Sequence, residues 1–207
     1  MKKEIFIRTY FEQEAAIELI AKRAGEIHRN VNQLYGGYLP YEFHLRLTAS
    51  YVTRYAYLLT LQENELQTLY AAAYFHDTLE DARLTYHDLQ KEFRQLNDKG
   101  CSILIDSAAE IVYALTNEKG RNREERADER YYNGIRKTKY ASFVKMCDRL
   151  ANMRYSTLLG IRQRMADIYE QELPEFFENI GKIPEEMKEE AKILIKEGIK
   201  RPTENIF

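Results

Sequence analysis

Apolar residues recur at three- and four-residue spacings along most of this chain. Between residues 11 and 29 the residues in this pattern are Phe11, Ala15, Ile17, Ile20, Ala24 and Ile27. Such a period places apolar side chains on one face of an α-helix. The same reasoning predicts further helices at about 42–61, 64–78, 85–96, 102–116 and 140–159, with Pro184 as the first residue of the last one.

Few residues mark the breaks between these helices. Gly36-Gly37 and Pro40 predict a loop. Thr85 and Asp88 have the spacing of a capping box, which predicts that a helix begins there. The polar stretch 117–139 has no clear period, and no segment alternates long enough to build a sheet. We therefore expect an all-α chain of roughly eight helices with short connections, in a single domain over residues 1–207.

Composition agrees with a soluble helical domain. Of the 207 residues 44% are hydrophobic and 31% charged, and only nine Gly and four Pro interrupt the chain. The apolar run Ile5-Phe6-Ile7 ends at Arg8, and no window approaches the roughly 20 apolar residues of a membrane span. Cys101 and Cys147 form no spaced motif, which favours reduced thiols and a cytoplasmic location. The net charge of −2 gives no general attraction for nucleic acid or anionic lipid.

The densest group of ionisable side chains follows the apolar stretch 69–73. It contains His76, Asp77, Glu80 and Asp81. Residues four apart on a helix are neighbours, so His76 would lie beside Glu80 and Asp77 beside Asp81. A His-Asp pair suits divalent cations, because imidazole binds Zn, Fe and Mn and carboxylate shifts the preference towards Mn or Mg. The alternative is a core histidine followed by a solvated helix end.

Two other segments place ionisable residues among apolar ones. Asp148 lies on a predicted helix with Asn152 one turn later on the same face. A buried aspartate is costly unless it is paired or bound to a metal; the alternative is a surface salt bridge to Arg149 or Arg154. His44 lies in the first turn of its helix, where a side chain can point across a cleft. Its alternative is a polar residue with no special role.

Together these segments resemble the HD phosphohydrolases, specifically the hydrolase domain of RelA/SpoT-type alarmone enzymes. That family carries Pro-Tyr-x-x-His, His-Asp-Thr-x-Glu-Asp and Lys-x-x-Asp-Arg/Lys-Leu-x-Asn stretches in this order. The matching segments here are Pro40-Tyr41-Glu42-Phe43-His44, His76-Asp77-Thr78-Leu79-Glu80-Asp81 and Lys145-Met146-Cys147-Asp148-Arg149-Leu150-Ala151-Asn152. The resemblance covers about residues 15–158 and implies an HD-domain helical bundle with that core and a C-terminal helical extension over 160–207.

The resemblance also implies roles. The residues that would hold one divalent metal ion are His44, His76, Asp77 and Asp148. Manganese is the ion that this family typically uses, and Zn²⁺, Fe²⁺ and Mg²⁺ are alternatives. Glu80 and Asp81 would orient or deprotonate the attacking water. Asn152 would contact the substrate.

The nucleotide side of the resemblance is incomplete. Family members usually carry a basic Arg-Lys pair shortly before the Pro-Tyr stretch, and it contacts the nucleotide. Here residues 32–38 contain no basic side chain. Stacking of a base on Tyr35, Tyr38 or Tyr41 is one substitute, and plain packing of these rings is the alternative.

A basic loop supplies positive charge elsewhere. Residues 116–126 resemble the family's Thr-x-x-Lys loop, which implies Lys119 as a phosphate contact, and we add Arg126. The acidic residues of the same stretch make a solvated loop with internal salt bridges the alternative.

We therefore expect a small stand-alone metal-dependent hydrolase that cleaves a nucleotide phosphate or pyrophosphate ester, foremost the 3′-pyrophosphate of (p)ppGpp. One alternative is another nucleotide phosphatase or pyrophosphatase with the same metal centre. A second is a helical nucleotide-binding or regulatory protein without turnover. The expected partner is a small-molecule nucleotide, with neither nucleic acid nor membrane, and the sequence indicates no oligomeric state.

Overall fold

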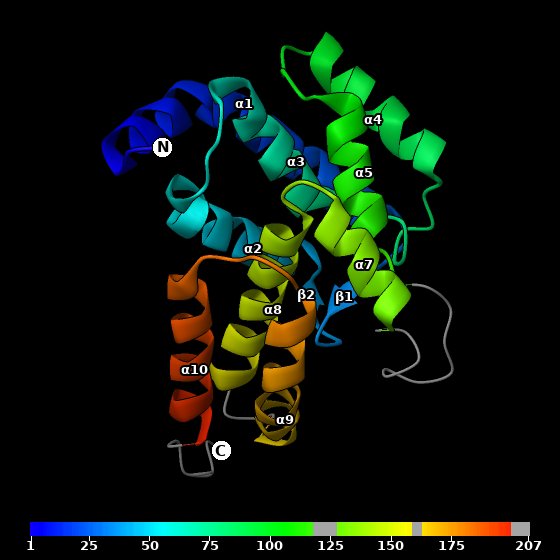
Figure 1. Cartoon of the computed structure of the whole chain (residues 1–207). Helices are drawn as coiled ribbons and strands as arrows, with labels where there is room; N and C mark the ends of the chain where they lie inside the picture. The colour runs from blue at the N-terminus through cyan, green and yellow to red at the C-terminus, as the bar shows by residue number, and fades with distance from the viewer. Residues whose placement is uncertain (118–127, 159–162, 200–207) are drawn as a thin grey trace.

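The structure is a computed structural model that describes residues 1–117, 128–158 and 163–199 (Figure 1). Within these residues the chain forms nine α-helices, two 3₁₀ turns and one small antiparallel ribbon, so the all-α prediction is confirmed. In chain order the elements are α1 (Lys3–Asn30), β1 (Leu34–Tyr35), β2 (Leu39–Pro40), α2 (Glu42–Tyr55), η1 (Ala56–Leu58), η2 (Glu63–Glu65), α3 (Leu66–Phe75), α4 (Tyr86–Asp98), α5 (Ile105–Leu115), α7 (Glu129–Lys137), α8 (Ala141–Leu158), α9 (Gln163–Asn179) and α10 (Glu185–Ile199).

Helix α3 lies at the centre of the molecule. All ten of its residues are buried, and helices α1, α2, α5 and α8 pack around it. The small side chains of Ala71, Ala72 and Ala73 let these neighbours approach closely. Figure 1 shows α8, α9 and α10 side by side in the lower half of the view, and α10 packs on both of the others. A fully buried helix can carry polar groups at its end only if they are paired there.

Capping residues set two of the helix starts. The predicted capping box is confirmed, because the Thr85 hydroxyl accepts a hydrogen bond from the Asp88 N–H and the Asp88 carboxylate accepts one from the Thr85 N–H. Helix α7 lies inside the polar stretch that had no clear period. It is capped by the Asp128 carboxylate, which accepts from the Tyr131 N–H at 2.9 Å.

Several boundaries differ from the predicted ones. Helix α1 begins at Lys3, earlier than the predicted residue 11, because Phe6 and Thr9 are also buried. Helix α2 ends at Tyr55 and continues only as the 3₁₀ turn η1. Helix α3 ends at Phe75, three residues before the predicted end, because the chain tightens into turns there. None of the described helices is long and apolar enough to span a membrane.

The ribbon of β1 and β2 replaces the simple loop that was predicted. Tyr35 pairs with Leu39, and the connection passes through Gly36 and Gly37, which have φ values of 64° and 89°. Residues other than glycine adopt such backbone angles only at a cost in free energy. A Cβ atom on Gly36 would lie 1.9 Å from the Tyr155 hydroxyl oxygen, so the turn packs directly against α8. This contact holds Tyr35 in place beside α2 and α8.

Gly36→Ala is expected to destabilise the protein more than Gly37→Ala. Both substitutions place a Cβ at positive φ, which costs about 1–2 kcal/mol. Only Gly36→Ala adds the clash with Tyr155, since an added Cβ on Gly37 meets no atom within 4 Å. We expect a further loss of about 1–3 kcal/mol for Gly36→Ala, measured by urea unfolding. Equal losses in the two variants would contradict the packing described here.

Candidate metal centre

Four predicted ligand residues come together from three helices. His44 is the third residue of α2, His76 and Asp77 follow the end of α3, and Asp148 lies in the middle of α8. These helices pack against one another in all three pairs. His44, His76 and Asp148 are 1%, 2% and 7% exposed, so the surface position of Asp148 in the alternative interpretation is wrong, while His76 is a buried histidine under either interpretation. Segments more than 70 residues apart in sequence thus supply one buried cluster.

The reactive atoms of the cluster are close. The Nε2 atoms of His44 and His76 are 3.2 Å apart. Asp77 Oδ2 lies 3.4 Å from His44 Nε2 and 2.8 Å from His76 Nε2. Asp148 Oδ1 lies 3.4 Å from His44 Nε2 and 3.6 Å from His76 Nε2. Both carboxylates therefore border the same pair of ring nitrogens.

These separations are compatible with ligands around one ion. Ligands placed about 2.0–2.3 Å from a cation are about 2.8–3.8 Å apart when they subtend octahedral right angles or tetrahedral angles. All five separations given above fall in that interval. His44, His76 and Asp77 also offer ligand atoms that lie within 4.8 Å of one another. The donor set of two imidazoles and two carboxylates fits a borderline divalent metal such as Mn²⁺, Fe²⁺ or Zn²⁺.

The end of α3 fixes the tautomer of His76. Its Nδ1 lies 2.8 Å from the Ala73 carbonyl oxygen, one of the last carbonyls of the helix. A carbonyl only accepts, so Nδ1 carries a proton and donates. In the neutral ring Nε2 then keeps its lone pair, which is the form that binds a metal.

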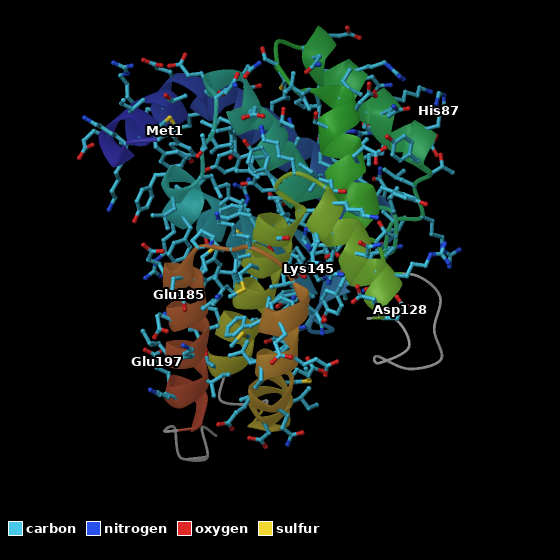
Figure 2. The ribbon with its side chains drawn as sticks, in the orientation of Figure 1. Met1, His87, Asp128, Lys145, Glu185 and Glu197 are labelled. Carbon is cyan, nitrogen blue, oxygen red and sulfur yellow. The ribbon has the colours of Figure 1, made fainter. Side chains whose placement is uncertain are left out.

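Asp148 is held by its own helix. Its Oδ1 accepts from the Asn152 amide at 2.6 Å, and its Oδ2 accepts from the Lys145 ammonium at 3.0 Å. Lys145 lies on α8 in the middle of the view in Figure 2. The alternative pairing of Asp148 with Arg149 or Arg154 is wrong, because these arginines bind other partners. Arg149 binds Glu172 and Arg154 binds Glu197.

Tyr41 holds Asp77. Its hydroxyl donates to Asp77 Oδ2 at 2.6 Å, and its ring stacks on His28 with the ring centroids 4.5 Å apart. His28 is completely buried, and neither of its ring nitrogens has a hydrogen-bond partner among the described residues. Burial lowers the pKa of His28 to about 4, so it packs as a neutral ring. The buried Tyr41 ring is therefore enclosed by protein and is wrongly placed to stack on a base.

The charges of the cluster support one another. Burial alone would lower the pKa of His76, but the negative charge of Asp77 and hydrogen bonds to both carboxylates raise it well above its usual value. Burial opposes the rise at His44 too, and hydrogen bonds to Asp148 and Asp77 outweigh it. The pKa values of Asp77 and Asp148 lie well below the usual range despite burial, because His76 and Lys145 carry the opposing charges. Protons thus take the place that a cation would fill.

Glu80 and Asp81 lie in the turns just beyond the cluster. The Asp81 N–H donates to the Asp77 carbonyl at 2.8 Å, so the expected four-residue neighbourhood of these acids survives although α3 has ended. Desolvation and the charge of Asp77 raise the pKa of both carboxyl groups. Glu80 Oε1 also accepts from the Asn117 N–H. Two acids with raised pKa values beside a cation site are suited to exchange protons with a bound water.

The remaining predicted residues have different placements. Asn152 binds Asp148 with its amide nitrogen and accepts from the Tyr35 hydroxyl at 2.9 Å with its amide oxygen. It therefore acts within the protein as a support for Asp148, and a substrate contact stays a prediction. Lys119 and Arg126 lie outside the described residues.

Sequence reasoning gave no role to Lys145 and considered Tyr35 and Tyr41 only as possible stacking partners for a base. Tyr35 stacks on the His44 ring, with centroids 4.8 Å apart, and bonds Asn152. The sequence contained a signal for Lys145 and Tyr41, because both belong to the quoted motif segments. No signal distinguished Tyr35 from the other 15 tyrosines.

Comparison with known proteins adds no family to this picture, since no protein-family model and no curated protein matches the chain.

Metal binding is expected to release protons. The raised pKa values of His44 and His76 mean that these rings hold a proton more tightly than an ordinary imidazole does, and a metal must displace it. Affinity for Mn²⁺ should therefore increase as pH rises through and above the ordinary range of imidazole titration. Calorimetry in buffers of different protonation enthalpy measures the released protons, and a pH-independent affinity would contradict the cluster.

Tyr41→Phe tests the support of Asp77. The substitution removes one hydroxyl and leaves the stacked ring, so the expected result is a loss of Mn²⁺ affinity of about 10- to 100-fold, as is usual for groups that orient metal ligands. Tyr55→Phe is the matched control, because it removes a tyrosine hydroxyl at the other end of α2 that bonds Glu190 of α10. Unchanged Mn²⁺ affinity in Tyr41→Phe would show that this hydrogen bond does not orient Asp77.

Proposed function

We propose that the protein is a metal-dependent phosphohydrolase of the HD type, folded as a single HD-type helical domain. Its substrate would be a nucleotide phosphate or pyrophosphate ester, with the 3′-pyrophosphate of (p)ppGpp as the first candidate. The observation that carries this proposal is the convergence of His44, His76, Asp77 and Asp148 on one point, with two more carboxylates beside it. The order and spacing of the three sequence segments add support that is independent of the geometry.

The donor set supports a role for one divalent cation, held by the two imidazoles and two carboxylates. Bound there, Mn²⁺ would polarise a phosphoryl oxygen and make a coordinated water more acidic. Asp77, with 21% of its side chain exposed, is the most accessible of the four ligands, so a substrate would approach from its side.

The residues around the cluster have separate tasks in this reaction. Glu80 and Asp81 would accept the proton of the attacking water, because their raised pKa values bring them closer to neutral pH than ordinary carboxylates. Lys145 keeps Asp148 ionised and so keeps it a ligand. Tyr41 and Asn152 hold the two aspartates by one oxygen each.

A different nucleotide phosphatase or pyrophosphatase remains the second candidate. It is favoured by the segment between α1 and α2, where residues 31–41 contain no Lys or Arg. A substrate with four or five phosphate groups needs many positive contacts. A less charged nucleotide needs fewer, and the exposed ring of Tyr38 in this segment suits its base.

Paired substitutions separate metal binding from chemistry. Asp77→Asn should abolish both Mn²⁺ binding and hydrolysis, because it removes a ligand charge. Glu80→Gln should retain Mn²⁺ and lower kcat by about 100-fold or more, since a well-placed base contributes that much. Asp98→Asn, at the exposed end of α4, is the control and should change neither quantity.

Hydrolysis is measured with Mn²⁺ on guanosine tetraphosphate, NADPH and deoxynucleoside triphosphates side by side. Activity on the first alone supports the alarmone reaction, and activity on another nucleotide supports the second candidate. Hydrolysis that persists unchanged in Asp77→Asn would refute the proposal. Metal binding with no turnover of any nucleotide by the wild-type protein would favour a binding protein instead.

A further inference from the structure

Exposed aromatic and apolar side chains gather at the ribbon. Ten large hydrophobic side chains are exposed among the described residues, and four of them fall within residues 31–43. The four are Val31, Leu34, Tyr38 and Phe43. The positive φ values of the ribbon turn explain Gly36 and Gly37 but not the exposed apolar side chains around them. Their clustering therefore suggests a surface that binds something.

Two of these exposed rings contact the same buried tyrosine. Tyr38 is 59% exposed and lies in the ribbon turn; Phe43 is 43% exposed and lies in the first turn of α2. Both contact the buried Tyr155 of α8. The Tyr38 and Tyr155 hydroxyl oxygens are 3.2 Å apart, and the Phe43 ring meets the Tyr155 ring edge to face at 6.3 Å. We call Tyr38 and Phe43 the aromatic platform.

The platform is joined to the metal centre by a single ring. Tyr35 stacks on Phe43 with centroids 6.2 Å apart and on His44 with centroids 4.8 Å apart. Its hydroxyl also donates to Asn152, which holds Asp148. A molecule that touches both the platform and the metal centre therefore needs to reach past the Tyr35 ring, which separates Phe43 from His44. A nucleoside with its phosphate has this reach.

The ionic groups nearest to Phe43 are neutralised. Glu42 accepts from Arg29 at 2.7 Å and from Arg46 at 2.9 Å, and Arg46 also binds Glu18. The platform thus offers ring faces and a tyrosine hydroxyl more than charge. Such a surface suits a flat heteroaromatic group, which stacks on rings whatever its hydrogen-bonding pattern.

We propose that the aromatic platform binds the base of the nucleotide substrate by stacking. The inference rests on the proposed function for the position of the phosphate, which would lie at the metal centre. A protein partner fits less well, because a stable interface takes roughly 20–30 residues on each side. The platform and the other exposed apolar residues of the segment, Val31 and Leu34, are only four side chains.

The test compares two ligands that differ only by the base. Guanosine 5′-monophosphate and ribose 5-phosphate are titrated calorimetrically into the full chain with Mn²⁺. We expect the nucleotide to bind the wild-type protein more tightly. Tyr38→Ala and Phe43→Ala should each weaken nucleotide binding by about 5- to 100-fold and leave ribose 5-phosphate binding unchanged. Adenosine 5′-monophosphate should follow the guanosine nucleotide, because stacking tolerates either purine.

Phe11→Ala is the matched control, since Phe11 is 65% exposed on α1 outside the ribbon and should change neither affinity. Thermal unfolding of each variant checks that the fold is kept. Equal affinity of the wild type for both ligands, or equal effects of the variants on both, would overturn the platform. A second copy of the chain is the other possible occupant. The platform would also be overturned if Tyr38→Ala removed self-association of the protein and left the ratio of the two ligand affinities unchanged.

Ligand binding is measured without turnover. The test can therefore refute the platform without refuting the proposed hydrolase function, and the reverse. A base-dependent affinity that is lost in the platform variants supports the platform even if no nucleotide is hydrolysed. Hydrolysis of nucleotides with an affinity ratio that the platform variants leave unchanged refutes the platform alone.

Discussion

Two ring nitrogens that face each other at 3.2 Å, between two carboxylates, set the main physical constraint on this molecule. Four electron-pair donors cannot crowd together in a buried place without positive charge between them. Lys145 supplies one charge from the side of Asp148, and protons on the imidazoles supply the rest when no metal is bound. In the proposed function a divalent cation would take over this role from the protons and be held by the same donors.

Support for the four donors comes from the same three helices that carry them or from residues next to these helices. Ala73 at the end of α3 orients His76, Tyr41 before α2 holds Asp77, and Asn152 on α8 holds Asp148. The ribbon adds Tyr35, which joins His44 to Asn152 and is itself kept in place by the tight contact between Gly36 and Tyr155. Loss of a group that orients a metal ligand in this way typically lowers metal affinity by about 10- to 100-fold. The apolar packing of α2, α3 and α8 therefore serves the site as well as stability.

Sequence patterns were sufficient for most of the helices, and the three motif segments were sufficient to select the four clustered residues. Periodic apolar spacing identified α1 to α5 and α8, and the Thr85 capping box identified the start of α4. Helix α7 was missed, because its buried face consists of only Tyr131, Tyr132 and Ile135 within a polar stretch. The ribbon was missed because two-residue strands are too short to show an alternating pattern.

The sequence alone did not predict which residues contact one another across the molecule. Periodicity assigns a residue to a face, but it does not say that the Tyr41 hydroxyl meets Asp77 or that Tyr35 lies on His44. Nor does it choose among basic residues close in sequence. Arg149 and Arg154 were plausible partners of Asp148, and only packing shows that Lys145 is the partner. These choices depend on how three helices meet, which is a tertiary property.

Anomalous diffraction from a crystal of the protein soaked in Mn²⁺ tests the central claim most directly. The account predicts one peak about 2.0–2.3 Å from Nε2 of His44 and His76 and from a carboxylate oxygen of Asp77 and of Asp148. A peak at another place, or a well-ordered cluster without any peak at saturating Mn²⁺, would contradict it.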